Sequence, residues 1–222
     1  MHRLTENFAI YCKKNFLLNE ITLTNYQSLS VCLIDCIYSL RAKYYSVTIP
    51  IVDRYANIYM NGNRNQDGDS VSDLIKHIEE CGGSKAFADL VLKNHQELGG
   101  KAHIPKEEAL LQLATYLKLL HIETIDDFRA FESPELLEIV IRAVKGMGDA
   151  GTNYLFMLAG DPDRCKPDVH IHHCIRDACG EDVTNEECQV IFQDAVKILK
   201  AENPGLTVRG LDGIIWRYYQ GK

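Results

Sequence analysis

Apolar residues at helical spacing recur along almost the whole 222-residue chain, and short turns rich in glycine or proline separate them. Apolar side chains three and four residues apart share one face of a helix, which the helix buries against its neighbours. We find no sustained alternation of apolar and polar residues, the pattern of strands, and no internal repeat. The sequence therefore predicts an all-α protein of about ten helices.

Local signals place the ends of these helices. Pro50 is compatible with the first turn of a helix, Gly82-Gly83-Ser84 predicts a stop and a new N-cap, and Ser133-Pro134-Glu135 predicts another start. The polar stretch 61–69 predicts a solvated loop, because it has too few apolar residues to pack. It is not predicted to bind calcium, since it lacks the sixth-position glycine and the terminal glutamate of a calcium loop. The ranges predicted to be helical are 29–59 with an interruption around 45–50, 70–78, 85–98, 106–120, 125–131, 134 up to the next glycine turn, 151–158, 169–179, 185–200 and 211–218.

Composition is typical of a soluble globular protein: 46% of the residues are hydrophobic, yet no apolar run is long enough to span a bilayer. The first residues are not followed by the apolar segment of a signal peptide. Several of the eight cysteines lie inside apolar helical patterns, as in 31–36, which predicts buried thiols in a reducing compartment. We therefore expect a cytoplasmic protein and a monomer.

The net charge of −7 argues against a protein that nucleic acid contacts on all sides, because non-specific DNA affinity scales with the phosphates that Lys and Arg neutralise. Net charge does not fix the local field, however, and four basic residues bracket two segments of interest. These positions are compatible with a local basic face and equally with ordinary solvated charges beside helices. They are Arg142, Lys145, Arg164 and Lys166.

A turn with two alternate glycines, Val144–Gly148, joins two of the predicted helices. Glycine reaches positive φ without a Cβ clash, so Gly146 and Gly148 allow the backbone to approach a partner closely. The first N–H groups of the next helix have no intrahelical acceptor and carry the positive end of the helix dipole. The turn therefore predicts a site for an anion such as a nucleic-acid phosphate.

Asp168 follows a proline and opens another predicted helix. An aspartate in this place is a favourable N-cap. A lone carboxylate beside a sugar also stabilises the positive charge that develops when an N-glycosidic bond breaks, and it can orient the attacking water. Capping and catalysis are thus both compatible with Asp168.

The segments Gly146–Tyr154 and Pro167–His170 together resemble the hairpin and catalytic segment of the helix-hairpin-helix-GPD superfamily of DNA glycosylases, the endonuclease III-like enzymes. In that superfamily a Gly-hydrophobic-Gly hairpin precedes an aspartate at the start of a later helix. Bifunctional members place a lysine two residues after the second glycine, where this chain has Ala150. Asp168 follows that position by 18 residues, which fits the pattern.

The resemblance implies a two-lobed helical fold. One lobe would be a helical bundle over 28–160 that ends in a helix-hairpin-helix at about 134–159, and the other would combine 1–27 with 161–222. Asp168 would lie at the cleft. An extra pair of helices over 110–132 departs from the compact pattern of the family.

The early segment Tyr38–Val47 is similar to a family loop in which many members carry a Ser-x-Gln element whose glutamine fills the gap left by a displaced base. Arg41 stands at the glutamine position, where it would plug the duplex or simply be an exposed arginine. The tyrosines that follow would stack on the base, or would pack the core with their hydroxyls reaching water. The resemblance assigns Gly146, Gly148, Lys145, Arg41 and Lys43 to DNA binding, and Tyr44, Tyr45 and His170 to the base pocket.

An alanine at position 150 cannot form the Schiff base that a lyase needs. We therefore predict a monofunctional DNA glycosylase that binds duplex DNA with a damaged or modified base, releases that base and leaves an abasic site. Alkylated, deaminated or enzymatically modified bases are the favoured classes, by analogy with monofunctional relatives. The alternative is a non-catalytic helix-hairpin-helix DNA-binding protein.

Cofactors are not expected. Many relatives end in four cysteines that hold an iron–sulfur cluster, whereas Cys188 is the last cysteine here, so we predict no cluster. His170 and Cys174 lie four residues apart, a spacing that two zinc ligands on one helix face would have. No further ligand pair at such spacing stands out, so a zinc site remains the weaker alternative to solvated or capping histidines.

Overall fold

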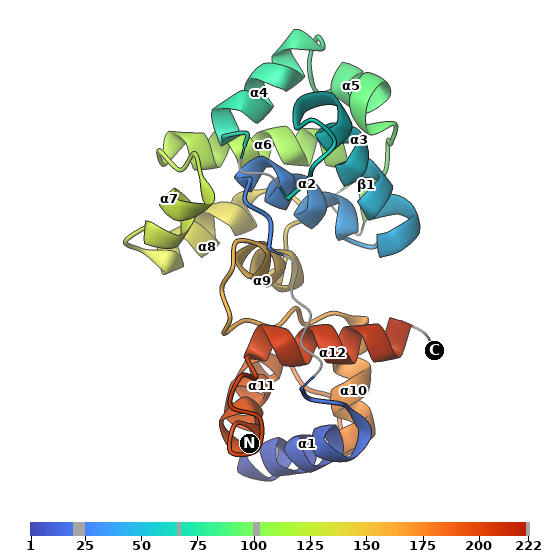
Figure 1. The fold of residues 1–222 in the computed structure, drawn as a ribbon, viewed down its shortest axis with the longest axis vertical. Coiled ribbons are helices and arrows are strands. Elements are labelled where there is room, and N and C mark those ends of the chain that lie inside the picture. The colour runs from blue at the N-terminus through green and yellow to red at the C-terminus, as the bar shows by residue number, and fades with distance from the viewer. Residues whose placement is uncertain (20–24, 66–67, 100–102, 221–222) are drawn as a thin grey trace. The chain divides into compact units, whose positions relative to one another are not determined.

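The structure is a computed structural model that describes residues 1–19, 25–65, 68–99 and 103–220. Within these residues it contains twelve α-helices, two π-helical segments and one pair of two-residue strands (Figure 1). The prediction of an all-α protein is confirmed. None of the described helices combines the length and the apolar composition needed to cross a membrane.

The chain divides into two compact units, each with its own hydrophobic core. The terminal unit consists of the described residues of 1–24 and 160–222, and the central unit consists of those of 25–159. The terminal unit has four helices, and the central unit has the rest.

In the terminal unit, α1 packs against α10 and α11, and α12 packs against the same two helices (Figure 1). Phe8 of α1 and Phe192 of α11 meet in its core, with ring centroids 4.9 Å apart. Cys12, Cys174 and Cys188 are also buried there, as expected of thiols in apolar helical patterns. The bounds are α1 (His2–Asn15), α10 (Val169–Cys179), α11 (Asn185–Leu199) and α12 (Val208–Gln220).

The central unit is built around α2, which packs against α3, α4, α6, α9 and η1. Every residue of α2 is buried, which fits a helix whose residues are mostly apolar. The bounds are α2 (Leu29–Ser39), η1 (Tyr44–Thr48), α3 (Ile49–Tyr59), α4 (Val71–Glu80), α5 (Ser84–Phe87), η2 (Ala88–Leu92), β1 (Glu97–Leu98), β2 (Ile104–Pro105), α6 (Lys106–Leu119), α7 (Ile125–Ala130), α8 (Pro134–Ala143) and α9 (Asp149–Leu158).

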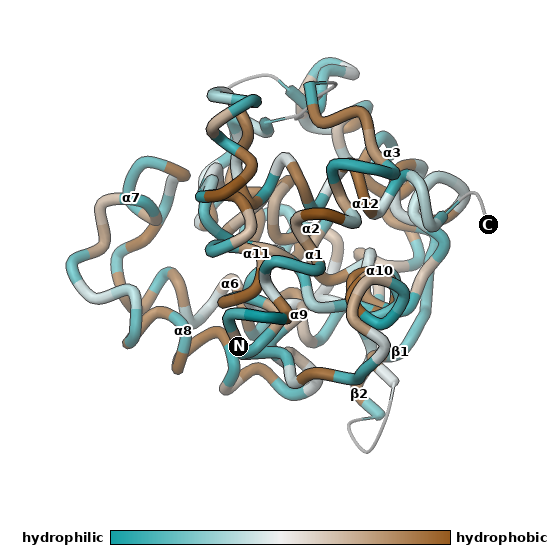
Figure 2. The backbone as a smooth tube through the Cα atoms, turned by 90° about the horizontal axis from the view of Figure 1, so that it is seen from below, coloured by the Kyte–Doolittle hydropathy of each residue, from teal (hydrophilic) through white to brown (hydrophobic). Residues whose placement is uncertain are grey.

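Most helix starts lie where the local signals place them. Ser133 accepts a hydrogen bond from the Leu136 N–H and so caps α8. The tube of α8 in Figure 2 has both hydrophobic and hydrophilic parts. Pro50 lies in the first turn of α3. Because these signals act through neighbours in sequence, they are visible without tertiary structure.

The helix predicted over 85–98 is wrong in both its start and its end. Gly83, with φ of +106°, is the N-cap of α5, so Ser84 is the first helical residue and not the cap. The helical path then widens into η2 and stops at Lys93, whose φ of +52° is left-handed. Residues 97–98 pair with 104–105 as short antiparallel strands. Backbone pairing of Gln96 O with the Lys106 N–H at 2.9 Å stabilises this departure from the helix.

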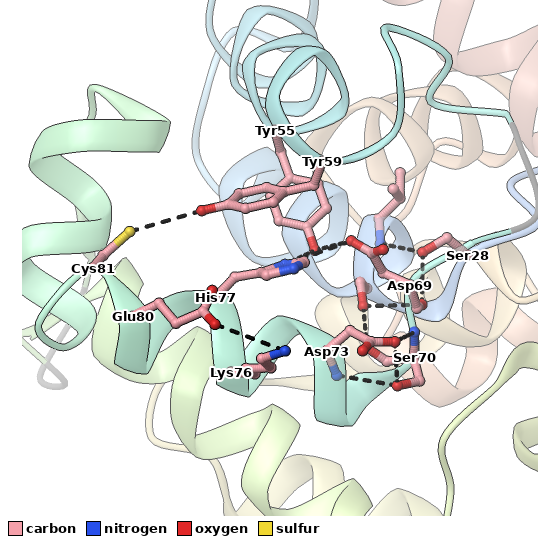
Figure 3. A network of polar contacts seen from close by, with 12 residues as sticks. Ser28, Tyr55, Tyr59, Asp69, Ser70, Asp73, Lys76, His77, Glu80 and Cys81 are labelled. Atoms are coloured by element: carbon pink, nitrogen blue, oxygen red, sulfur yellow. Dashed lines mark hydrogen bonds and ion pairs between the residues drawn. The ribbon is translucent and has the colours of Figure 1, made fainter.

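A polar network joins the start of α4 to α2 and α3 (Figure 3). Tyr55 Oη donates to Asp69 Oδ2 at 2.6 Å and lies 3.2 Å from His77 Nδ1. The ring of Tyr59 stacks on His77 at 3.8 Å between centroids. Ser28, the N-cap of α2, donates to the Asp69 carbonyl at 3.0 Å. The network therefore fixes the residues that lead into α4.

Candidate functional site

The glycine turn between α8 and α9 is a tight, exposed connection. Gly146 has a φ of +93°, the left-handed region that favours glycine. The Met147 N–H donates to the Val144 carbonyl at 3.0 Å and closes the turn. Met147 and Val144 are buried, whereas Lys145, Gly146 and Gly148 are exposed. The apolar side chains anchor the turn and leave its backbone accessible.

Helix α9 begins without a side-chain cap. Its N-cap is Gly148, in an extended conformation with φ of −100° and ψ of −168°. A Cβ at Gly148 would meet none of the described atoms within 4 Å. Asp149 occupies the first turn and pairs with Arg142 at 3.2 Å, so part of its charge is compensated. The start of α9 is thus open to an acceptor from outside the chain.

The loop after α2 lies beside this turn in the central unit. A Cβ at Gly151 of α9 would lie 3.0 Å from Met147 Sδ and 3.4 Å from Leu40 Cδ1. The Gly151 carbonyl also accepts from Cys36 Sγ at 3.3 Å. Gly151 therefore allows α9 to approach the end of α2, where Arg41 follows Leu40. This close packing brings together two segments that the sequence analysis considered separately.

Arg41 and Lys43 are both exposed in that loop. Arg41 has a φ of +54°, and its side chain covers Gly99, where a Cβ would collide with the guanidinium group. Lys106, which is buried, donates through Nζ to the Leu40 carbonyl at 2.8 Å and holds the end of α2. The loop is therefore fixed at its base.

Tyr44 and Tyr45 have different environments. Tyr44 is half-buried and donates through Oη to Asp35 Oδ2 at 2.9 Å, and burial raises its pKa above the ordinary range. Tyr45 is 62% exposed and packs edge-on against Tyr44, with centroids 5.5 Å apart. Tyr45 thus presents an aromatic ring at the surface, and this ring packs against the more buried ring of Tyr44.

Asp35 is a polar centre that sequence reasoning missed. It is wholly buried, and two further phenols donate to it, Tyr26 to Oδ2 at 2.7 Å and Tyr154 to Oδ1 at 2.9 Å. Burial raises the pKa of both phenols well above their usual value. The carboxyl joins α2, the Tyr44 segment and α9. The available signal was the single acid in an otherwise apolar helix.

Asp168 lies in the terminal unit, where it is the N-cap of α10. Its Oδ1 accepts the His170 N–H at 2.9 Å and the Ile171 N–H at 3.3 Å. Among the described residues, the hydrogen bonds to this side chain end on Oδ1. Pro167 before it is buried, whereas Asp168 and His170 are half-buried. The carboxylate is held by two amides and keeps a second oxygen for other interactions.

Asp212 of α12 is another residue that the sequence analysis missed. It is 5% exposed, and its Oδ2 accepts the Lys166 N–H at 2.8 Å. Burial, and then the charge of Asp168, raise its pKa to about 8. An acid at the start of an amphipathic helix gives no sequence signal for this role, because the role depends on a loop 46 residues earlier.

The described residues contain no group of three side chains that could hold a metal ion. Cys174 is buried against Cys12. Burial is the main cause that raises the pKa of the Cys12 thiol, and the hydrogen bond with Cys174 raises it further. His172 Nε2 instead contacts Asn185 Oδ1 at 2.9 Å. Within the described residues, His170 and Cys174 therefore belong to no group of three ligands that could hold a metal ion.

Comparison with known families gives one match. A sequence model described as "Domain of unknown function (DUF8548)" matches residues 8–220. The chain has no match among curated proteins.

Proposed function

We propose that this chain, which belongs to the DUF8548 family, is a monofunctional DNA glycosylase of the helix-hairpin-helix-GPD type. One observation carries the proposal. An exposed glycine turn with an uncapped helix start precedes an aspartate that caps the next helix, at the separation found in that superfamily. In this interpretation α8, the turn and α9 form the helix-hairpin-helix, and the protein has the two-lobed glycosylase fold.

The turn would bind a phosphate of duplex DNA. The first N–H groups of α9 point toward its N-terminal end, where Gly148 has no side chain to accept them, and Lys145 is exposed on the turn before it. Such amides and the helix dipole favour an anion. Lys43 and Arg41 lie on the loop that packs beside α9, so they extend the same contact, and Arg41 would enter the duplex.

A displaced base would stack on an aromatic surface. Unstacking a base costs a few kcal/mol, which contacts in the pocket must offset. Tyr45 offers an exposed ring, and Tyr44 is fixed beneath it by Asp35. In the terminal unit, His170 lies two residues after Asp168, and the resemblance assigns it a contact with the base. The substrate would be duplex DNA with an alkylated, deaminated or enzymatically modified base.

Asp168 would assist hydrolysis of the N-glycosidic bond. Two amides orient its Oδ1, so Oδ2 is the oxygen that would face the sugar or the attacking water. A carboxylate there stabilises the oxocarbenium-like transition state. Water attacks the anomeric carbon and gives up a proton, the bond to the base breaks, and the base leaves with the electron pair of that bond and takes up a proton. Ala150 supplies no amine, so the strand stays intact at the abasic site.

The test is a screen of duplexes that carry single modified bases. We expect the purified monomer to release one class of base, and Asp168→Asn, which keeps a capping oxygen, to release it far more slowly. Equal rates for the two proteins would remove Asp168 from the reaction. Free base is measured directly, and abasic sites are measured by strand scission after hot alkali.

A non-catalytic DNA-binding protein is the second candidate. The net charge of −7 and the acidic Asp149 in the first turn of α9 favour it, because both weaken electrostatic contact with a backbone. Salt-dependent binding to duplex DNA, without base release from any duplex in the screen, would support this candidate.

A further inference from the structure

The segment before α10 is held by contacts from two other helices of the terminal unit. Gln189 of α11 accepts the Cys165 N–H through Oε1 at 3.0 Å and donates through Nε2 to the Asp163 carbonyl at 2.7 Å. The Arg209 N–H, at the start of α12, donates to the Pro162 carbonyl at 3.0 Å. The segment therefore has a fixed course before it reaches Asp168.

Asp212, in the second turn of α12, makes the last of these contacts. Its Oδ2 accepts the Lys166 N–H at 2.8 Å. The Lys166 carbonyl in turn accepts the Asp168 N–H at 2.7 Å. The buried carboxyl of Asp212 is thus connected to the backbone of Asp168 through the N–H and the carbonyl of Lys166.

The groups around Asp212 keep it neutral. Burial raises its pKa most, and the negative charge of Asp168 raises it further, whereas Lys166 and Arg209 lower it, with a result of about 8. Cys165 also faces Asp212, and burial, followed by the charge of Asp212, raises the pKa of that thiol. Asp212 is therefore protonated at neutral pH.

We propose that Asp212 is the positioning residue of Asp168: its buried carboxyl holds the backbone of Lys166 and so fixes the direction of the Asp168 carboxylate. The chemical purpose of this arrangement rests on the proposed glycosylase function. The contacts themselves do not depend on it. Ionisation of Asp212 would add a buried negative charge near the half-buried Asp168, and opening of the segment would relieve the cost of that charge.

Two readouts on the whole chain test the positioning role without any substrate. Carbon NMR of the aspartate carboxyls measures the titration of Asp212, which we expect near pH 8. Amide exchange measures the protection of the Lys166 and Asp168 N–H groups. Asp212→Asn keeps an acceptor for the Lys166 N–H and should keep that protection. Asp212→Leu removes this acceptor, so the Lys166 N–H should exchange at least about tenfold faster.

Asp194→Asn is the matched control, because it removes one carboxylate from the exposed side of α11. It should change neither the titration nor the exchange. Titration of Asp212 in the ordinary carboxyl range, near pH 4, would overturn the proposal. So would unchanged exchange in a folded Asp212→Leu protein. If that variant does not fold, the titration and the Asp212→Asn exchange decide.

The pH profile of base release connects the pair to the reaction. We expect wild-type activity to fall as pH rises through about 8, because Asp212 ionises there. Asp212→Asn should retain activity above that pH. The same alkaline fall in both proteins would contradict the positioning role. Absence of base release by the wild type contradicts the proposed function instead, and leaves the titration and exchange as the test of Asp212.

Discussion

Helices α9 and α10 start with nearly the same backbone and opposite chemistry. Gly148 caps α9 with φ of −100° and ψ of −168°, and Asp168 caps α10 with φ of −99° and ψ of −176°. The first has no side chain to accept the N–H groups of the helix, whereas the second accepts two of them. One helix start is therefore suited to an external anion, and the other holds an anion of the protein itself.

The comparison shows how one local geometry serves two purposes. Orphan N–H groups need an acceptor in either case. In α9 the N-cap supplies no side-chain acceptor, and in α10 the acceptor is a carboxylate whose orientation the amides then fix. A change of side chain alone, with no change of backbone, should convert one kind of helix start into the other.

The largest expected effect is loss of base release on changing Asp168. Asp168→Asn keeps the cap but loses the charge, so we expect single-turnover excision to fall by roughly 10²–10³-fold, the cost of removing one stabilising group in other enzymes. Asp168→Ala removes the cap as well and should lower the free energy of unfolding by about 1 kcal/mol. Denaturant melts beside excision rates separate the two roles. If Asp168→Asn excised the base at the wild-type rate, Asp168 would only cap α10 and would have no part in the reaction.

The next effect is on stability against pH, through the residue that fixes the start of α10. The pKa of Asp212 is raised in the folded state, so the unfolded chain loses that proton near pH 4 and the folded chain near pH 8. Wild-type stability should therefore fall as pH rises between these values, by at most about 1.4 kcal/mol per pH unit from this group. Asp212→Asn should lack that fall, as denaturant melts from pH 4 to 9 would show. Parallel curves would contradict a neutral Asp212.

A third prediction makes α9 start like α10. Gly148→Asp has room for its side chain and should cap α9, adding a few tenths of a kcal/mol of stability. It also places a negative charge where phosphate is expected, so duplex affinity should fall roughly tenfold. Gly148→Asn is the matched control, because it caps without charge and should weaken binding less. Full affinity of the Asp variant, measured by fluorescence anisotropy, would mean that the turn does not contact DNA.

The smallest expected effect concerns Lys145, exposed on the turn. Lys145→Gln should weaken duplex binding a few-fold and reduce the salt dependence of log K by about one counterion. Lys76→Gln, on α4, removes an equal charge and should not change the salt dependence. If log K depended on salt concentration equally in both variants, Lys145 and its turn would not be part of the DNA interface.

The sequence predicted what depends on neighbours along the chain. As predicted, Ser133 caps α8, Asp168 caps α10, and Pro50 lies in the first turn of α3. The stretch after Ser84 was predicted as one helix because its apolar spacing is helical, but left-handed Lys93 and backbone pairing end it early. Periodicity cannot detect a pairing partner that lies further along the chain.

The candidate site was less accessible from sequence. Tyr44 was expected at a pocket, but the carboxyl that fixes it, Asp35, carries no local signal beyond its place in an apolar helix. Asp212 depends on a loop of another part of the chain. Gly151, which lets α9 approach Leu40, was noted only as a helix start. These roles arise from tertiary packing, which spacing along one chain does not encode.

The measurement that tests the account most directly is simultaneous detection of free base and of strand breaks after incubation with a modified-base duplex. We predict a released base in equal amount to alkali-sensitive abasic sites, with the strand intact before alkali, because in the proposed reaction Asp168 assists hydrolysis and Ala150 offers no amine. Base release from no duplex in the panel would contradict the glycosylase assignment. Strand scission without alkali would contradict its monofunctional form.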